Sequence, residues 1–205
     1  MQYATIEREY VVTTEVCKSK FICRLAPIET LDEGLEYVAR IKKEFSDARH
    51  NCYAIVGTPE SNALKYSDDG EPSGTAGIPM MGALQKNGLY GVACVVTRYF
   101  GGIKLGAGGL VRAYAGAGSD VIKLCQLGTF NDLKTIRISC DIPYAKKLLD
   151  YLRNNNVKVI SQEYSNLFSV KVAVEDENIL CGLSDEYIKE QLETTKVFYD
   201  KDNEN

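Results

Sequence analysis

The sequence predicts an α+β protein with two domains. Its 205 residues include 45% hydrophobic and 25% charged side chains, which is enough for one large core or two small ones. The first half has the pattern of strands, then a helix, then a strand, whereas the last third follows a β-α-β-β-α-β order. We place the first domain at residues 1–130 and the second at residues 131–205.

The first domain begins with a predicted β-hairpin. Residues 5–12 and 16–25 are rich in Val, Ile, Thr and aromatic side chains, and a short polar break separates them. A helix follows, with a capping box at Thr30 and Glu33, and residues 51–57 form the next strand. The apolar face of this helix repeats at helical spacing through Leu31, Leu35, Val38, Ile41 and Phe45.

A second helix and a buried strand are predicted next. Pro79 suits a first helical position and Gly88 a left-handed stop, so a short helix lies between them. Residues 92–97 are continuously apolar, as in a central strand that is buried on both faces. Arg98 and Tyr99 therefore emerge at the end of this strand.

The chain then enters a third predicted helix and the second domain. Residues 110–127 form this helix, and Gly128 ends it. Beyond it the predicted strands are 133–140, 157–164, 167–174 and 196–199, and the predicted helices are 143–154 and 178–192. The two-residue break Ser165-Asn166 suits a tight hairpin between the two middle strands. This order is the ferredoxin-like arrangement.

The formal net charge is -4, and the excess of acidic side chains lies in the last third. Through Phe130 the chain has 14 basic (Lys and Arg) and 14 acidic (Asp and Glu) residues. From Asn131 onward it has 10 basic and 14 acidic residues. This distribution is unlike that of a strongly basic nucleic-acid domain. No apolar run approaches the ~20 residues that a membrane span needs, and the start does not resemble a secretion signal. We expect a cytoplasmic protein.

The seven cysteines form no Cys-x-x-Cys pair, and the chain has a single histidine. An odd number at this spacing argues against a disulfide framework and against a zinc site. Because most of them lie in apolar runs, as Cys94 does, we expect small buried side chains. A nucleophile pair of His50 and Cys52 is formally available two positions apart on a strand, but a structural histidine is the simpler interpretation.

The stretch from Asp68 to Ser119 is the candidate functional segment. An acidic turn is followed by a long segment without Asp or Glu, in which the charged side chains are Lys86, Arg98, Lys104 and Arg112. A strand, a glycine-rich turn and a helix start can direct backbone N–H groups toward a phosphate or carboxylate. We predict that an anion or a partner binds at Arg98, Tyr99, Gly101, Gly102, Lys104, Gly106, Gly108, Gly109 and Arg112.

The acidic turn leaves alternatives open. Its predicted site residues are Asp68, Asp69, Glu71 and Thr75. The carboxylates could neutralise Arg98 and Arg112, and the glycines would then permit positive φ and tight contact between backbone segments. Both roles could also hold together, since a carboxylate network can orient arginines that still face a ligand. They could instead hold a hard cation, although an acidic β-turn is the commoner explanation. We predict no metal, no cofactor and no catalytic residue.

The glycine-rich turn matches neither common nucleotide-binding fingerprint. Ala107 stands where a Walker A loop has Lys, and Val111 replaces the third glycine of the dinucleotide motif. The segment therefore indicates an anion-binding surface without indicating a nucleotide.

Long motifs across the chain resemble those of the YigZ/IMPACT family. They are DDGEPSGTAGIP at residues 68–79, VTRYFGGIKLG at 96–106 and GLVRAY at 109–114, with HNCYA at 50–54 and KSKFI at 18–22. The resemblance covers almost the whole chain. It implies a first domain similar to the second domain of a small-subunit ribosomal protein and to the fourth domain of elongation factor G. It also implies a second domain similar to the ferredoxin-like fifth domain of that factor.

The resemblance further implies a role. Eukaryotic relatives attach the first domain to a different partner domain and act in translational control through protein binding. We therefore expect a non-enzymatic, translation-linked or regulatory protein that presents its basic glycine-rich surface to RNA, a ribosome or a translation-related protein. The alternative is an enzyme that acts on a small phosphorylated or carboxylated metabolite, with the glycine loop holding the anion and Asp69 or Glu71 as base.

Overall fold

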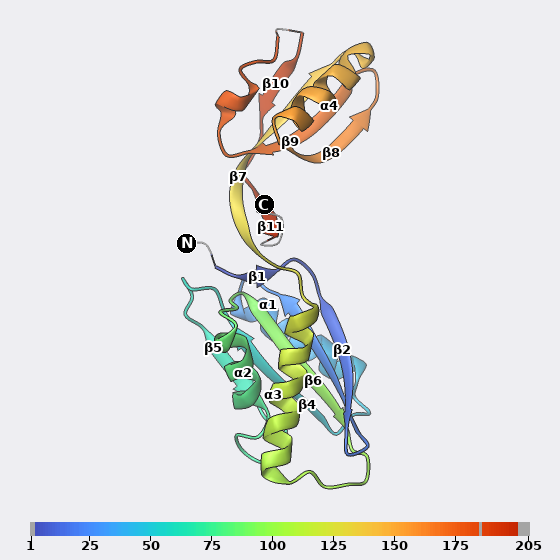
Figure 1. Ribbon diagram of the computed structural model, residues 1–205, viewed down its shortest axis with the longest axis vertical. Helices are drawn as coiled ribbons and strands as arrows, with labels where there is room; N and C mark the ends of the chain where they lie inside the picture. The colour runs from blue at the N-terminus through green and yellow to red at the C-terminus, as the bar shows by residue number, and fades with distance from the viewer. Residues whose placement is uncertain (1–2, 185, 201–205) are drawn as a thin grey trace. The chain divides into compact units, whose positions relative to one another are not determined.

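The computed structural model describes residues 3–184 and 186–200 and has a mixed α/β architecture (Figure 1). Within these residues it contains two antiparallel sheets and four α-helices, which is consistent with the predicted α+β class. The chain divides into two compact units, one of which spans Phe130–Phe198 while the other takes the remaining residues. Strand β7 (Leu127–Cys140) begins in the first unit and continues into the second.

The sheet of the first unit follows the order β2-β3-β6-β4-β5, and each neighbouring pair is antiparallel. These strands are β2 (Tyr10–Val16), β3 (Ser19–Pro27), β6 (Val92–Tyr99), β4 (His50–Val56) and β5 (Leu64–Ser67). The predicted hairpin is present, but its turn is at Cys17 and Lys18, and the expected polar break at residues 13–15 is part of β2. Both turn residues have positive φ, as a tight two-residue hairpin turn requires.

Helices cover both faces of this sheet. Helix α1 (Leu31–Glu44) packs on one face, and α2 (Gly77–Lys86) and α3 (Gly106–Leu124) lie side by side on the other (Figure 1). The central strand β6 is buried on both faces, as its continuous apolar run predicted. The capping side chain of α1 is also confirmed, because Thr30 Oγ1 accepts a hydrogen bond from the Glu33 N–H at 3.2 Å.

The ends of two helices differ from the prediction. Helix α2 begins at Gly77, ahead of Pro79, and Gly88 beyond its end has a φ of +64° as expected of a left-handed stop. Helix α3 begins and ends earlier than residues 110–127. Gly128 does not end it, because Gly128 lies in β7 opposite Thr5 of strand β1 (Thr5–Ile6). This pairing holds the chain after α3 in an extended conformation.

The second unit has the strand order β10-β7-β9-β8. Its further elements are η1 (Ile142–Tyr144), α4 (Ala145–Asn154), β8 (Lys158–Tyr164), β9 (Phe168–Val174), η2 (Glu177–Leu180) and β10 (Ile188–Gln191). Strand β11 (Thr195–Asp200) also pairs with β7 and, like β7, has residues in both units. The hairpin between β8 and β9 has a three-residue loop, because Tyr164 pairs with Phe168, so the two-residue turn predicted there is wrong.

The predicted helix over residues 178–192 is also wrong. Only the short 3₁₀ turn η2 forms there, and β10 then pairs with β7. Leu180, Leu183 and Tyr187 have helical spacing and are all buried, but they enter the core from an irregular segment that contains Gly182. Pairing with the free edge of β7 therefore takes the place of the helix.

Candidate functional site

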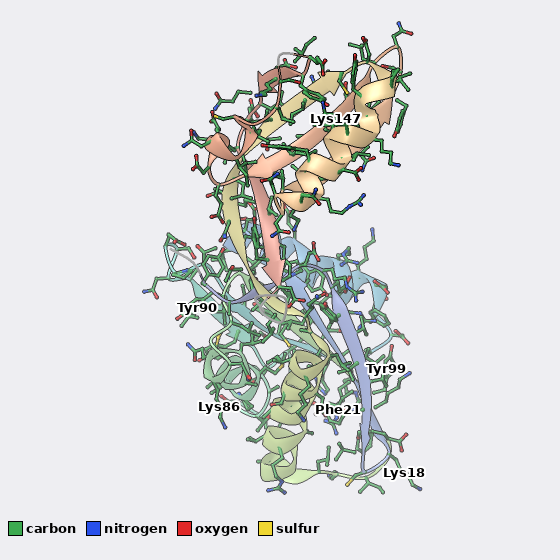
Figure 2. All side chains as sticks on the ribbon, turned by 45° about the horizontal axis from the view of Figure 1, so that its top comes forward. Lys18, Phe21, Lys86, Tyr90, Tyr99 and Lys147 are labelled. Atoms are coloured by element: carbon green, nitrogen blue, oxygen red, sulfur yellow. The ribbon has the colours of Figure 1, made fainter. Side chains whose placement is uncertain are left out.

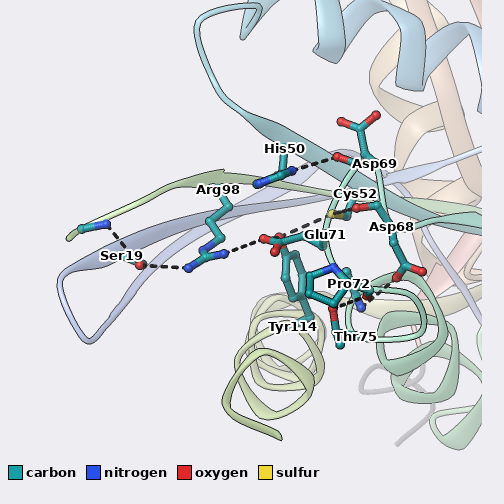
Figure 3. A network of polar contacts seen from close by, with 12 residues as sticks. Ser19, His50, Cys52, Asp68, Asp69, Glu71, Pro72, Thr75, Arg98 and Tyr114 are labelled. Atoms are coloured by element: carbon teal, nitrogen blue, oxygen red, sulfur yellow. Dashed lines mark hydrogen bonds and ion pairs between the residues drawn. The ribbon is translucent and has the colours of Figure 1, made fainter. Parts of the chain in front are cut away.

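Asp68 organises the acidic turn between β5 and α2. Its Oδ1 accepts hydrogen bonds from the backbone N–H groups of Ala76 at 2.9 Å and Gly77 at 2.8 Å, and its Oδ2 accepts one from Gly74 at 2.8 Å (Figure 3). Burial opposes ionisation of this carboxyl group, but the three N–H groups outweigh it and hold the pKa of Asp68 below its usual value. Asp68 thus satisfies backbone donors at the start of α2.

Asp69 ties the same turn to the neighbouring elements. Its Oδ1 lies 2.5 Å from Nζ of Lys42 on α1, and its Oδ2 accepts from the backbone N–H of Asn51 at 2.7 Å. The Asp69 carbonyl oxygen lies 2.9 Å from Nδ1 of His50 (Figure 3). His50 therefore has the structural role that the sequence favoured.

Glu71 forms a buried ion pair with Arg98. Its Oε1 lies 2.7 Å from Nη1 of Arg98 and accepts a hydrogen bond from the Tyr114 hydroxyl at 2.8 Å (Figure 3). The side chains of Arg98 and Glu71 are only 7% and 3% exposed. The two charges neutralise each other away from water, and neither can be lost alone without leaving the other buried and unpaired.

Arg98 consequently does not emerge at the end of β6 as the sequence predicted. The strand continues to Tyr99, and the guanidinium turns inward, where its Nη2 donates to Ser19 Oγ at 3.3 Å. Its central carbon lies 5.4 Å from the ring centroid of Phe21 and 5.7 Å from that of Phe100. Of the two alternatives left open for Arg98, the structure shows pairing with the acidic turn.

Cys52 and Tyr114 complete this buried network, and the Cys52 Sγ donates to the Asp68 carbonyl oxygen at 2.9 Å. Burial, reinforced by the nearby Glu71 and Asp69, raises the pKa of Cys52 to about 12. Burial also raises the pKa of Tyr114, whose ring packs edge-on against Phe21 at 5.3 Å. A thiol with such a pKa stays protonated near neutral pH, so His50 and Cys52 do not form an activated nucleophile pair.

The turn that follows β6 is held by a close backbone approach. A Cβ built on Gly101 would overlap the carbonyl group of Lys18, and the Gly101 N–H donates to Ser19 Oγ at 3.2 Å. Gly102 and Gly106 have φ of +89° and +69°, which favour glycine. Gly108 and Gly109 lie in the first turn of α3. Gly101 therefore serves a close backbone contact, and Gly102 and Gly106 serve positive φ, as in the alternative role considered for these glycines.

Two cations of the predicted site remain at the surface. Lys104 and Arg112 are exposed and line one depression of about 350 Å³, whose other lining residues are Val16, Cys17, Leu105, Gly109 and Ala113. Neither side chain forms an ion pair with any residue that the structure describes. The first turn of α3 beside them contains no acidic residue.

Lys18 adds a third exposed cation at this end of the unit (Figure 2). The carbonyl group of Lys18 lies against Gly101, whereas Lys20 stands opposite Glu15 in the register of the hairpin. We call the group of Lys18, Lys104 and Arg112, with residues 100–109 (the loop after β6 and the first turn of α3), the basic end.

The remaining predicted site residues have internal partners. The Tyr99 hydroxyl donates to Asp47 at 2.9 Å, and Thr75 Oγ1 donates to the Pro72 carbonyl oxygen at 2.6 Å. Within residues 3–184 and 186–200, no group of three or more His, Cys, Asp or Glu side chains is arranged to hold a metal ion. The three carboxylates of the acidic turn face different partners.

The sequence did not single out Ser19 and Tyr114 of this network, and it offered Cys52 only as a nucleophile or as a small buried side chain. All three lie inside the motifs that carry the family resemblance, which was the available signal. Of the cysteines expected to be buried, Cys17 and Cys181 are exposed, and all seven are free thiols. Among the described helices, none is long and apolar enough to cross a membrane.

Comparisons with known proteins place these features in context. The family model of the Impact N-terminal domain matches residues 17–122. IMPACT family member YvyE of Bacillus subtilis is 40% identical over 159 residues, which cover 78% of this chain and 73% of that protein. IMPACT family member YigZ of Escherichia coli is 35% identical over 165 residues, which cover 80% and 81%. A crystal structure of a hypothetical protein matches with a TM-score of 0.61 at 34% identity, over 84% of this chain and 85% of that one.

Proposed function

The chain belongs to the IMPACT family, and from this premise we propose that it is a non-enzymatic binding protein that holds an anionic partner at its basic end. We place its role in translation or in regulation, with RNA, a ribosome or a translation-related protein as the partner. The observation that carries the proposal is the exposed pair of Lys104 and Arg112, which share one depression and have no described ion-pair partner. Such a pair retains its charge for a ligand.

The distribution of acidic groups supports the same proposal. The carboxylates of Asp68, Asp69 and Glu71 are all engaged by backbone N–H groups, by Lys42 or by Arg98. They therefore do not compete for the cations of the basic end. A polyanion that approaches this end meets positive charge. It also meets glycines, which have no side chain to keep phosphate groups away from the backbone.

We also propose that the second unit is a ferredoxin-like domain, and its strand order supports this assignment. Its antiparallel order β10-β7-β9-β8, with α4 between β7 and β8 in the chain, is the order of a ferredoxin-like domain in which the second helix is reduced to η2. We propose that the two domains correspond to the fourth and fifth domains of elongation factor G. This likeness favours a partner from the translation machinery.

The enzymatic alternative has less support. It requires Asp69 or Glu71 as a base, but Asp69 is engaged by Lys42 and the Asn51 N–H, and Glu71 is buried against Arg98 and Tyr114. A general base needs a free oxygen within reach of substrate. We therefore take binding, without chemistry, as the function.

Co-sedimentation with ribosomes and with total RNA across a salt series tests this function. The test variant replaces Lys104 and Arg112 by Gln, and the matched control replaces Lys146 and Lys147, two exposed cations of α4, in the same way. We expect binding that weakens with salt and is lost only in the first variant. Binding that ignores salt and is equal in all three proteins would refute the proposal.

A further inference from the structure

The basic end exposes apolar side chains as well as cations. Phe100 is 50% exposed, Ile103 is 47% exposed and Val111 is 38% exposed, and they lie in the loop after β6 and in the second turn of α3. Other aromatic rings of the same unit, such as Phe21 and Tyr114, are fully buried. Phe100 and Ile103 precede Lys104 in the same loop, and Val111 adjoins Arg112 on α3. Several exposed apolar side chains this close in the chain to exposed cations indicate a contact surface.

Phe100 is held by a rigid neighbourhood. It follows directly on β6, and the next residue, Gly101, is fixed by Ser19 Oγ and by the close approach of the Lys18 carbonyl group. On its inner side the guanidinium carbon of the buried Arg98 lies 5.7 Å from the ring centroid. A ring that is already positioned loses little conformational entropy when a ligand stacks on it.

The combination of an exposed aromatic ring with unpaired cations is characteristic of single-stranded nucleic-acid binding. Cations neutralise the backbone, and the ring stacks on an unpaired base. In a duplex the bases are stacked within the helix, so a duplex would meet the cations alone. Lys104 and Arg112 line a depression, and its concave shape suits a phosphate group better than the flat surface of a membrane.

We propose that the basic end binds single-stranded RNA, with phosphates at Lys104 and Arg112 and one base stacked on Phe100. This inference rests on the proposed function, because it names the class of partner. Binding of a polyanion in general needs only negative charge. This inference also requires an unpaired base next to Phe100.

Fluorescence anisotropy of the full chain tests this inference with a labelled oligouridine of about 12 nucleotides and a blunt RNA duplex of the same length. Phe100→Leu keeps an apolar side chain but removes the aromatic face. Tyr164→Leu is the control, because this ring is 62% exposed on β8 in the second unit. Thermal unfolding of each variant establishes that it is folded before binding is compared.

We expect wild-type protein to bind the single strand more tightly than the duplex, and Phe100→Leu to weaken binding of the single strand roughly ten-fold while leaving the duplex unchanged. Tyr164→Leu should bind both as wild type does. Equal binding of single strand and duplex, or an unchanged affinity of Phe100→Leu, would overturn this inference and leave the proposed function standing. Failure of wild-type protein to bind any RNA or ribosome would overturn both. Loss of vesicle binding rather than RNA binding in Phe100→Leu, with vesicles of anionic lipid, would identify a membrane surface instead.

Discussion

The acidic turn and the basic end belong to the same unit but use charge in opposite ways. At the acidic turn, each of the three carboxylates is engaged by protein groups, and Arg98 is buried against one of them, Glu71. At the basic end, Lys104 and Arg112 are exposed and have no ion-pair partner among the described residues. The family motifs therefore combine two tasks. One part stabilises the unit, and the other leaves positive charge for a partner.

Arg98 is the position at which the two tasks meet. It pairs with Glu71 on the acidic side, and through Ser19 it is connected to the Gly101 N–H of the basic end. Variants on the two sides should therefore have different effects. Changes in the acidic turn should mainly lower the free energy of unfolding, whereas changes at the basic end should mainly alter binding.

The largest effect is expected for Glu71→Ala. This change leaves the Arg98 guanidinium as an uncompensated buried charge, and the free energy of unfolding should fall by about 3–5 kcal/mol. Urea denaturation measures it. In a double-mutant cycle, Arg98→Met combined with Glu71→Leu should recover much of the loss. A cost below about 1 kcal/mol for Glu71→Ala would mean that the ion pair does not hold the turn.

Gly101→Ala should have the next largest effect on stability. The added Cβ would overlap the Lys18 carbonyl group, so the hairpin turn or the loop must move, at a cost of about 2–3 kcal/mol. Gly116→Ala in α3 is the control, because nothing lies within 4 Å of its Cβ, and it should stabilise the protein by about 0.5–1 kcal/mol. Thermal unfolding compares the two, and equal effects would contradict the close approach at Gly101.

Asp68→Asn should change how stability depends on pH. The pKa of Asp68 is lower in the folded state than in the unfolded chain, so its contribution is present above the unfolded pKa of about 3.9 and is lost as pH falls through the folded pKa. The variant places an amide N–H₂ or a weaker acceptor against backbone donors and should lose about 1–2 kcal/mol at neutral pH. Denaturation at pH 7 and near pH 3 checks it. The difference between the two proteins should shrink at the lower pH, and a constant difference would contradict the assignment.

The smallest effect on stability is expected at the basic end. Replacing Lys104 and Arg112 together by Gln should change the free energy of unfolding by less than about 0.5 kcal/mol, because neither side chain has an ion-pair partner to lose among the described residues. Urea denaturation again gives the measurement. A loss comparable to that of Glu71→Ala would show that these cations are structural.

Local patterns were sufficient to predict the elements whose neighbours lie close in sequence. The α1 cap was predicted from the spacing of Thr30 and Glu33, and the doubly buried β6 from its continuous apolar run. The structure of residues 178–192 was predicted wrongly. Their apolar residues have helical spacing, but in the tertiary fold this segment supplies β10, which pairs with the edge of β7. Propensity yields to such pairing when a strand edge must be covered.

The candidate site shows the same division. Its charged residues were found from the absence of acidic neighbours in the sequence, but the burial of Arg98 depends on Glu71 and Ser19, which lie far from it in the chain. The hydroxyl of Tyr114 has its partner on another element as well. Which cation is neutralised and which stays free is decided by tertiary contacts that no local pattern contains.

The salt dependence of RNA binding measures whether the free charge of the basic end holds the anionic partner. The logarithm of the affinity for single-stranded RNA should fall linearly with the logarithm of the salt concentration. Replacing Lys104 and Arg112 by Gln should reduce the slope by about 1.4, since each phosphate contact to a single strand contributes about 0.7. The Lys146 and Lys147 control should keep the wild-type slope, and an identical slope in all three proteins would contradict the account.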